Sequence, residues 1–274
     1  MSDTTSIRKF DRKAAKAQAS ARIKEEMTPP IWQLTLLVAV ISMVATELLS
    51  VLSESGVNGF LVLLISIVLD IVLMLFLSGD TVYIMKVARV QPGAGYPDLK
   101  YGFGPMAGKL ILLMIETAVR VYLWTLLFVI PGLVAAYRYR FSLYILIDNP
   151  DISAGEAIHR SKAMTQGRKG EQLALDLSFT GWYILAVLLQ TVGTFIGATL
   201  GTLTGSIIAF YLLSIVVSVL LMALIMVCLQ AYMGVTCVYF YDFARNEALR
   251  TASEAAAAAQ AAGGGGSFQH NAQY

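Results

Sequence analysis

One apolar run decides the fold class of this 274-residue chain. Between Asp176 and Asp242 the sequence reads LSFTGWYILAVLLQTVGTFIGATLGTLTGSIIAFYLLSIVVSVLLMALIMVCLQAYMGVTCVYFY, 65 residues without an Asp, Glu, Lys or Arg. A helix needs about 20 apolar residues to cross the hydrocarbon of a bilayer, so this run is long enough for two spans. The glycine- and threonine-rich stretch Gly201–Ser206 is expected to be the turn between them.

The composition of the whole chain points to the same class. Hydrophobic residues make up 57% and charged residues 14%, with a mean hydropathy of +0.68, whereas a soluble domain carries about 25% charged residues. The net charge is only +2, and no basic face interleaved with aromatic residues marks a nucleic-acid binder. The lipid bilayer is therefore the expected partner, and nucleic acid is not.

Four further apolar segments precede the long run. They are Ile31–Leu52, Phe60–Val87, Leu110–Ile130 and Leu133–Ile147. Because lipid offers the backbone no hydrogen-bond partners, helices are expected throughout. The sequence thus predicts an all-α, polytopic transmembrane helix bundle of about six hydrophobic segments. The fourth is short, follows Pro131–Gly132 and carries Arg138 and Arg140, which fits either a short tilted span or a re-entrant hairpin.

The positions of the basic residues predict the orientation. Of the 20 Lys and Arg residues, 17 lie in the N-terminal region, in the connection around residues 86–109, in the insert and in the C-terminal tail. The positive-inside rule then places both termini in the cytoplasm. The expected organisation is a basic amphipathic arm over residues 1–30, a transmembrane domain over 31–245 with a cytoplasmic insert over 148–171, and a disordered Ala/Gly-rich tail over 246–274.

Ionisable residues in the apolar segments are the first candidate site. Asp70 lies in the second segment, and Glu116 and Arg120 form an i, i+4 pair in the third. Burial of an ionisable side chain in a membrane costs free energy, so such residues are functional candidates by default. Two interpretations stay open: a polar track for protons, ions or a lipid headgroup, or an interior ion pair that fixes helix packing.

The insert offers a second candidate site. Its basic residues are Arg160, Lys162, Arg168 and Lys169, and an amphipathic helix is expected over Gly155–Met164 with Ser153 and Glu156 at capping-box spacing. These side chains either contact anionic lipid headgroups or serve topology and anchoring.

Glycines at four-residue spacing predict close helix packing. Gly193, Gly197 and Gly201 continue to Gly205, and small residues at this spacing let helix backbones approach one another. Packing within the chain is expected first, with association to a second copy or a partner membrane protein as the alternative. Gly201 and Gly205 could also belong to the turn.

Motifs of catalysis are absent from the sequence. It contains no H-E-x-x-H, no G-x-S-x-G, no Walker loop and no paired cysteine clusters. We therefore expect no catalytic residue, no cofactor and no metal site.

Residues 130–182 read IPGLVAAYRYRFSLYILIDNPDISAGEAIHRSKAMTQGRKGEQLALDLSFTGW. This stretch resembles the bacterial integral-membrane family catalogued as domain of unknown function 975. The matching positions are Ile130–Gly132, Tyr137, Asp148–Ser153, Ser161, Met164, Gly167, Lys169 and Leu175–Trp182. The resemblance implies a six-segment bacterial plasma-membrane protein and carries over no catalytic residue.

Two functions follow as expectations. The first is a non-enzymatic scaffold or accessory protein of the bacterial cell envelope. The second is a small transporter or a lipid- or peptide-handling protein that uses Asp70, Glu116 and Arg120.

Overall fold

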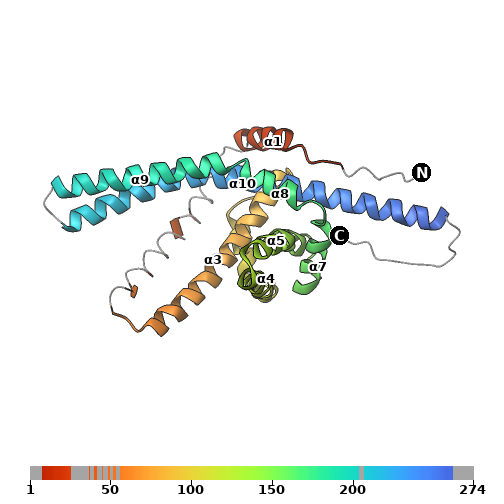
Figure 1. Ribbon diagram of the computed structural model, residues 1–274, viewed down its shortest axis with the longest axis horizontal. Helices are drawn as coiled ribbons and strands as arrows, with labels where there is room; N and C mark the ends of the chain where they lie inside the picture. Colours follow the sequence, from red (N-terminus) through yellow and green to blue (C-terminus); the bar gives the residue numbers. More distant parts are fainter. Residues whose placement is uncertain are drawn as a thin grey trace. The chain divides into compact units, whose positions relative to one another are not determined.

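In the computed structural model every element of the described residues is helical (Figure 1). The structure describes residues 8–25, 37, 40, 41, 45, 49, 52, 53, 56–203 and 207–261. The elements are α1 (Arg12–Glu25), α3 (Gly59–Ala88), η1 (Tyr96–Phe103), α4 (Ala107–Leu127), α5 (Val129–Tyr139), α6 (Ser142–Asp148), α7 (Ala154–Met164), α8 (Lys169–Leu177), α9 (Thr180–Leu203) and α10 (Ile207–Ala261). The prediction of an all-α protein is confirmed for this part of the chain.

Three of these helical segments are long and apolar enough to cross a membrane. They are Gly59–Ala88, Ala107–Leu127 and Lys169–Ile196, the last comprising α8 and most of α9. The first two coincide closely with the expected segments Phe60–Val87 and Leu110–Ile130. The expected first segment, Ile31–Leu52, lies largely outside the described residues.

The expected fourth segment, Leu133–Ile147, is not one helix. α5 ends at Tyr139 and α6 begins at Ser142. Between them Phe141 has φ −92° and ψ 4°, a bridge-region conformation that interrupts the helix. The segment is therefore shared by an 11-residue helix and a 7-residue helix, and each is far too short to span a bilayer alone.

The chain divides into two compact units. The first unit comprises Met1–Ala15, Gly108–Ala174 and Thr236–Tyr274, and the second unit comprises Lys16–Ala107 and Leu175–Val235.

In the second unit, two glycines let the backbone of η1 lie directly against α3. A Cβ placed on Gly102 would lie 2.1 Å from Leu75 O, and one placed on Gly79 would lie 2.6 Å from Leu99 Cα. Any side chain at these positions would collide with backbone. Lys86 and Asp98 add an ion pair, and the rings of Phe76 and Phe103 meet edge to face with centroids 4.8 Å apart.

The same unit contains α9 and the first part of α10, which run side by side (Figure 1). Tyr183 Oη donates to Met233 Sδ over 3.2 Å, and the rings of Phe179 and Tyr232 lie 5.3 Å apart. Gly234 of α10 faces α3, because a Cβ there would lie 2.9 Å from Ile84 Cδ1. These contacts tie α10 to both α9 and α3.

The core of the first unit is aromatic. Phe141, Phe240 and Tyr241 are each 1% exposed. The ring of Phe141 lies 5.8 Å from that of Phe240 and 5.6 Å from that of Tyr241, and Tyr144 lies 5.3 Å from Tyr241. Ring pairs of this kind contribute about 0.5–1.5 kcal/mol each beyond their buried area. They fix the start of α6 on the later part of α10.

The expected boundary of the C-terminal tail is corrected by the structure. α10 continues to Ala261, so residues 246–261 are helical rather than disordered. Alanine has the highest helix propensity, and Arg250 pairs with Glu247 and Glu254 one turn away on either side. Residues 262–274 lie outside the described residues.

In the N-terminal arm, α1 begins at Arg12. The carboxylate of the preceding Asp11 accepts hydrogen bonds from the N–H groups of Lys13 and Ala14 and so caps the helix. Residues 1–7 and 26–30 lie outside the described residues.

Candidate functional site

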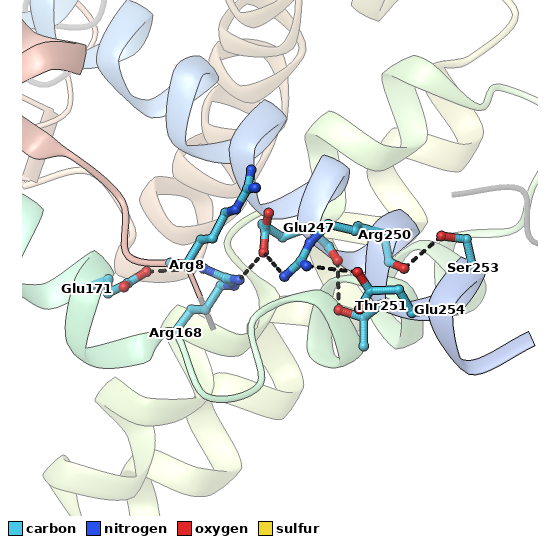
Figure 2. A network of polar contacts seen from close by, with 8 residues as sticks. All are labelled: Arg8, Arg168, Glu171, Glu247, Arg250, Thr251, Ser253 and Glu254. Atoms are coloured by element: carbon cyan, nitrogen blue, oxygen red, sulfur yellow. Dashed lines mark hydrogen bonds and ion pairs between the residues drawn. The ribbon is translucent and has the colours of Figure 1, made fainter. Parts of the chain in front are cut away.

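A network of charged side chains connects three parts of the first unit (Figure 2). The carboxylate of Glu247 on α10 lies 3.0 Å from Arg250 Nη2 and 3.7 Å from Arg168 Nη2. Arg168 and Glu247 are each 7% exposed. Arg168 also contacts Glu171 Oε2 at 3.4 Å. The hydrogen bond with Glu247 is the largest influence on Arg250, whose pKa it raises. We call Arg168, Glu171, Glu247, Arg250 and Glu254 the arginine network.

The N-terminal arm docks on this network. Arg8 O accepts a hydrogen bond of 3.1 Å from Arg168 Nη1. The ring of Phe10 meets Phe240 edge to face at 4.7 Å and lies 5.4 Å from Phe243. Arg12 Nη1 donates to Ala174 O over 2.9 Å. Part of the basic amphipathic arm therefore packs against protein.

The turn Asp148–Ser153 is held at both ends. Asp148 Oδ2 accepts a hydrogen bond of 2.9 Å from Tyr241 Oη and pairs with Arg245 Nη1 at 3.1 Å. Lys109 Nζ donates to Pro150 O. Ser153 Oγ then accepts from Glu156 N–H over 3.2 Å, which confirms Ser153 as the N-cap of α7. The turn thus connects α4, α7 and α10 within the first unit.

The structure brings Glu116 and Arg120 together. Arg120 Nη1 lies 2.9 Å from Glu116 Oε2, and the two side chains are 40% and 28% exposed. The start of α7 is close by, because a Cβ placed on Gly155 would lie 3.7 Å from Glu116 Oε2. Asp70 is exposed on α3 in the second unit, so its membership of a polar track with Glu116 and Arg120 stays a prediction.

The four basic residues predicted as headgroup contacts fall into two pairs. Arg160 Nε lies 2.7 Å from Glu156 Oε1, and Arg168 belongs to the arginine network. Lys162 and Lys169 have no carboxylate within ion-pairing distance among the residues that the structure describes. Burial lowers the pKa of Lys169, and the nearby positive charges of Arg138 and Lys162 lower it further. Arg138 was not predicted for this site, because its sequence position inside an apolar segment hides its place beside the insert.

The tip of the α4–α5 hairpin is strongly apolar and exposed. Phe128, Val129 and Ile130 are 69%, 75% and 74% exposed, and Phe128 alone, with φ −160° and ψ 150°, separates the two helices. Gly132 makes the close turn possible, since a Cβ there would lie 2.7 Å from Thr125 Cα. The break expected at Pro131–Gly132 therefore lies at Phe128, and the Ile-Pro-Gly sequence belongs to the first turn of α5, where the apolar surface is exposed.

Of the predicted packing glycines, Gly193 is buried on α9, whereas the surroundings of Gly197 and Gly201 and the position of Gly205 lie outside the description. Sequence reasoning missed the close-contact glycines Gly79 and Gly102. It also missed Asp80 of α3, which is 4% exposed and whose Oδ1 has no hydrogen-bond partner among the described residues. Its only sequence signal is a second acid, after Asp70, within a mostly apolar helix.

No group of His, Cys, Asp and Glu in the described part of the chain could hold a metal ion.

Fold and site define an all-helical protein with three candidate membrane-spanning helices. The chain belongs to the family described as Protein of unknown function (DUF975), whose model matches residues 106–248. No curated protein and no solved structure matches the chain.

Proposed function

We propose that the protein is a non-enzymatic scaffold or accessory protein of the bacterial cell membrane, with several membrane-embedded segments and both termini in the cytoplasm. The observation that carries this proposal is the use of the charged side chains in the first unit. Glu247 joins Arg168 to Arg250, and Asp148 joins the turn after α6 to α10. These groups hold structural elements to one another, as a rigid membrane-attached platform requires.

The energetics support a structural role for these pairs. Arg168 and Glu247 have side chains that are each 9% exposed, and removal of one partner of a buried pair costs about 3–5 kcal/mol because the other charge stays buried. Arg168 also carries the contact with Arg8 O. Buried contacts of this kind stabilise one conformation of the unit. They therefore fit a rigid scaffold better than a transporter, which must open to pass a solute.

The geometry of α4, α5 and α7 favours a re-entrant hairpin over a crossing. The polar helix α7 contacts Glu116 of α4 at its start and Arg138 O of α5 near its end, through Ser161 Oγ at 2.8 Å. From those two contact points, the arm of α4 reaches the tip at Phe128 over about 18 Å and the arm of α5 over about 15 Å, at 1.5 Å per residue. With α7 at the membrane surface, the tip reaches about half of a hydrocarbon core of roughly 30 Å.

Cysteine labelling tests this topology. In a background without Cys228 and Cys237, Val129→Cys is expected to resist a membrane-impermeant maleimide added to the outside of intact cells. Thr204→Cys, in the predicted outer turn, is the matched control and is expected to react. Labelling of Val129→Cys at the rate of the control would show that the hairpin crosses, and the topology would have to be revised.

Complementation of a deletion strain tests the scaffold function. The strain is compared with wild type for membrane lipid composition and sensitivity to peptide antibiotics, and the variants are expressed in it. The charge-free double variant Glu116→Gln/Arg120→Gln is expected to restore the phenotype at normal protein level, because a scaffold needs the fold and not the charges. Loss of complementation at normal protein level would contradict the scaffold and support a transport track.

The second candidate function is a small transporter or a lipid- or peptide-handling protein. One observation favours it: the buried Asp80 in a candidate span, with an oxygen that lacks a hydrogen-bond partner among the described residues. Ionisable groups in spans often mark ion or substrate paths. Under this function Asp80→Asn abolishes complementation at normal protein level, whereas Asp151→Asn, at an exposed position outside the candidate spans, serves as control. Under the scaffold function both variants complement.

A further inference from the structure

Three basic residues, Arg138, Lys162 and Lys169, belong to segments that meet at the base of the α4–α5 hairpin. Ser161 Oγ and Thr165 Oγ1 of the last turn of α7 both donate to Arg138 O, over 2.8 and 3.4 Å. Lys162 lies between these two anchoring residues in the sequence. Gly167, with φ +79°, then reverses the chain, a left-handed conformation that suits glycine, and Lys169 begins α8. Lys169 is thereby brought close enough to Arg138 and Lys162 for their charges to lower its pKa, after the larger effect of burial.

These three residues lack the acidic partners that several of their neighbours have. Arg120, Arg160, Arg168, Arg245 and Arg250 of the first unit each have a carboxylate within 4 Å. Arg138, Lys162 and Lys169 have none among the described residues. Three like charges held together by backbone anchoring repel one another, and a bound anion would remove that repulsion.

We infer that Arg138, Lys162 and Lys169 form a binding site for the phosphate group of an anionic membrane lipid. Arginine binds phosphate with a planar pair of donors, and lysine adds a compact positive charge. The inference rests on the proposed membrane placement of the hairpin, and it names the ligand class at its base.

The surroundings favour a lipid over a free anion. Arg138 lies at the end of α5 opposite the exposed apolar tip at Val129 and Ile130, which are 75% and 74% exposed. An acyl chain that lies along α5 would therefore place its headgroup beside Arg138. Lys169 is the first residue of the candidate span Lys169–Ile196, so a second basic residue of the site stands where the chain enters the apolar region.

Lipid binding to the purified full-length protein tests the site. The delipidated protein in detergent is titrated with phosphatidylglycerol and with phosphatidylcholine of the same acyl chains, and bound lipid is counted by native mass spectrometry. We expect wild type to prefer phosphatidylglycerol. Each of Arg138→Gln, Lys162→Gln and Lys169→Gln is expected to weaken its binding about fivefold, the equivalent of roughly 1 kcal/mol per basic residue, and phosphatidylcholine binding is expected to stay unchanged.

The chain supplies a matched control two residues from Lys162. Arg160→Gln removes the same charge from α7, but Arg160 is already paired with Glu156, so the preference for phosphatidylglycerol should persist. An equal loss in Arg160→Gln would overturn the site, because it would show attraction to net charge alone. Retained preference in the three single variants would overturn it as well.

Two further arms separate the remaining outcomes. Inorganic phosphate at millimolar concentration is expected to leave bound phosphatidylglycerol in place; displacement would show a site for free phosphate and overturn the assignment to lipid. Lys162→Arg and Lys169→Arg are expected to retain binding, which separates loss of charge from loss of fold. Because the maleimide labelling reports topology independently, failure of the lipid site and failure of the proposed hairpin would be told apart.

Discussion

The two units of the protein are held together by different means. In the second unit, η1 lies against α3 because Gly79 and Gly102 have no side chains, so that backbone meets backbone. In the first unit, long charged side chains from distant parts of the sequence meet at Glu247 and Asp148. Close helix packing and ion pairs are thus alternative ways to fix helices, with different sensitivity to substitution and to salt.

The largest effect is expected from Gly102→Val. Its Cβ would lie 2.1 Å from Leu75 O, so η1 must move away from α3. Overpacking costs about 1–3 kcal/mol and occasionally more, and a side chain that meets backbone is expected at the upper end of that range. Thermal unfolding in detergent, followed by circular dichroism, is expected to show a clear drop in Tm. Gly59→Val at the start of α3 is the control, because nothing lies within 4 Å of its Cβ; equal drops in both variants would refute the close-packing account.

A smaller but still large effect is expected from Glu247→Gln. It leaves Arg168 and Arg250 without their shared carboxylate, and we expect a loss of about 3 kcal/mol in the free energy of unfolding. Denaturant titration of the first unit's aromatic signal measures it. Glu254→Gln, which removes an exposed partner of Arg250, serves as the control and should cost less than about 0.5 kcal/mol. Similar losses in both would remove the distinction between buried and exposed pairs.

The tie at Asp148 is expected to come next. Asp148→Asn keeps the shape and an acceptor for Tyr241 Oη, but it removes the charge that faces Arg245 at 3.1 Å. A charge-assisted hydrogen bond contributes about 1.5–3 kcal/mol, and Arg245 is one-third exposed, so we expect a loss near 1 kcal/mol. The double-mutant cycle with Arg245→Gln measures the coupling, and a coupling of zero would show that the pair does not hold the turn to α10.

The smallest effect is expected from Arg160→Gln. Its partner Glu156 has a side chain that is 45% exposed, and exposed i, i+4 pairs contribute about 0.3–0.5 kcal/mol. The Tm should change by no more than a degree or two.

Salt tests the burial of the arginine network in the wild-type protein. Addition of 0.5 M salt should lower the Tm only slightly, because buried ion pairs are screened weakly. A large drop in Tm with salt would show that the network is exposed to water.

Local sequence patterns predicted the helices more completely than the contacts between them. The bounds of α3 and α4 follow from apolar length, and the N-cap Ser153 follows from the chemistry of one residue. The helical part of the tail was missed because a polar, Ala-rich segment was read as disordered, although alanine favours helix and Arg250 has acidic partners on the same face.

The candidate site depended on residues far apart in the sequence. Nothing near Arg168 indicates that Glu247 will partner it, or that Lys162 will have no partner while Arg160 has one. The glycine spacing at Gly193 predicted close packing in α9, yet the tightest backbone contacts described lie at Gly79 and Gly102, which share no periodic spacing. Pairing and close approach are tertiary properties, so composition and periodicity leave them open.

Pro131 affects the hydrogen bonding at the start of α5. The first N–H groups of any helix lack partners within the helix, and in hydrocarbon each such group costs several kcal/mol. At the start of α5, Pro131 has no N–H, and Gly132 N–H donates to Phe128 O over 3.2 Å. When the hairpin tip lies in the membrane, only the N–H groups of Val129 and Ile130 lack helical partners at the start of α5. The proline thus lowers the cost of starting a helix in the interior of the membrane.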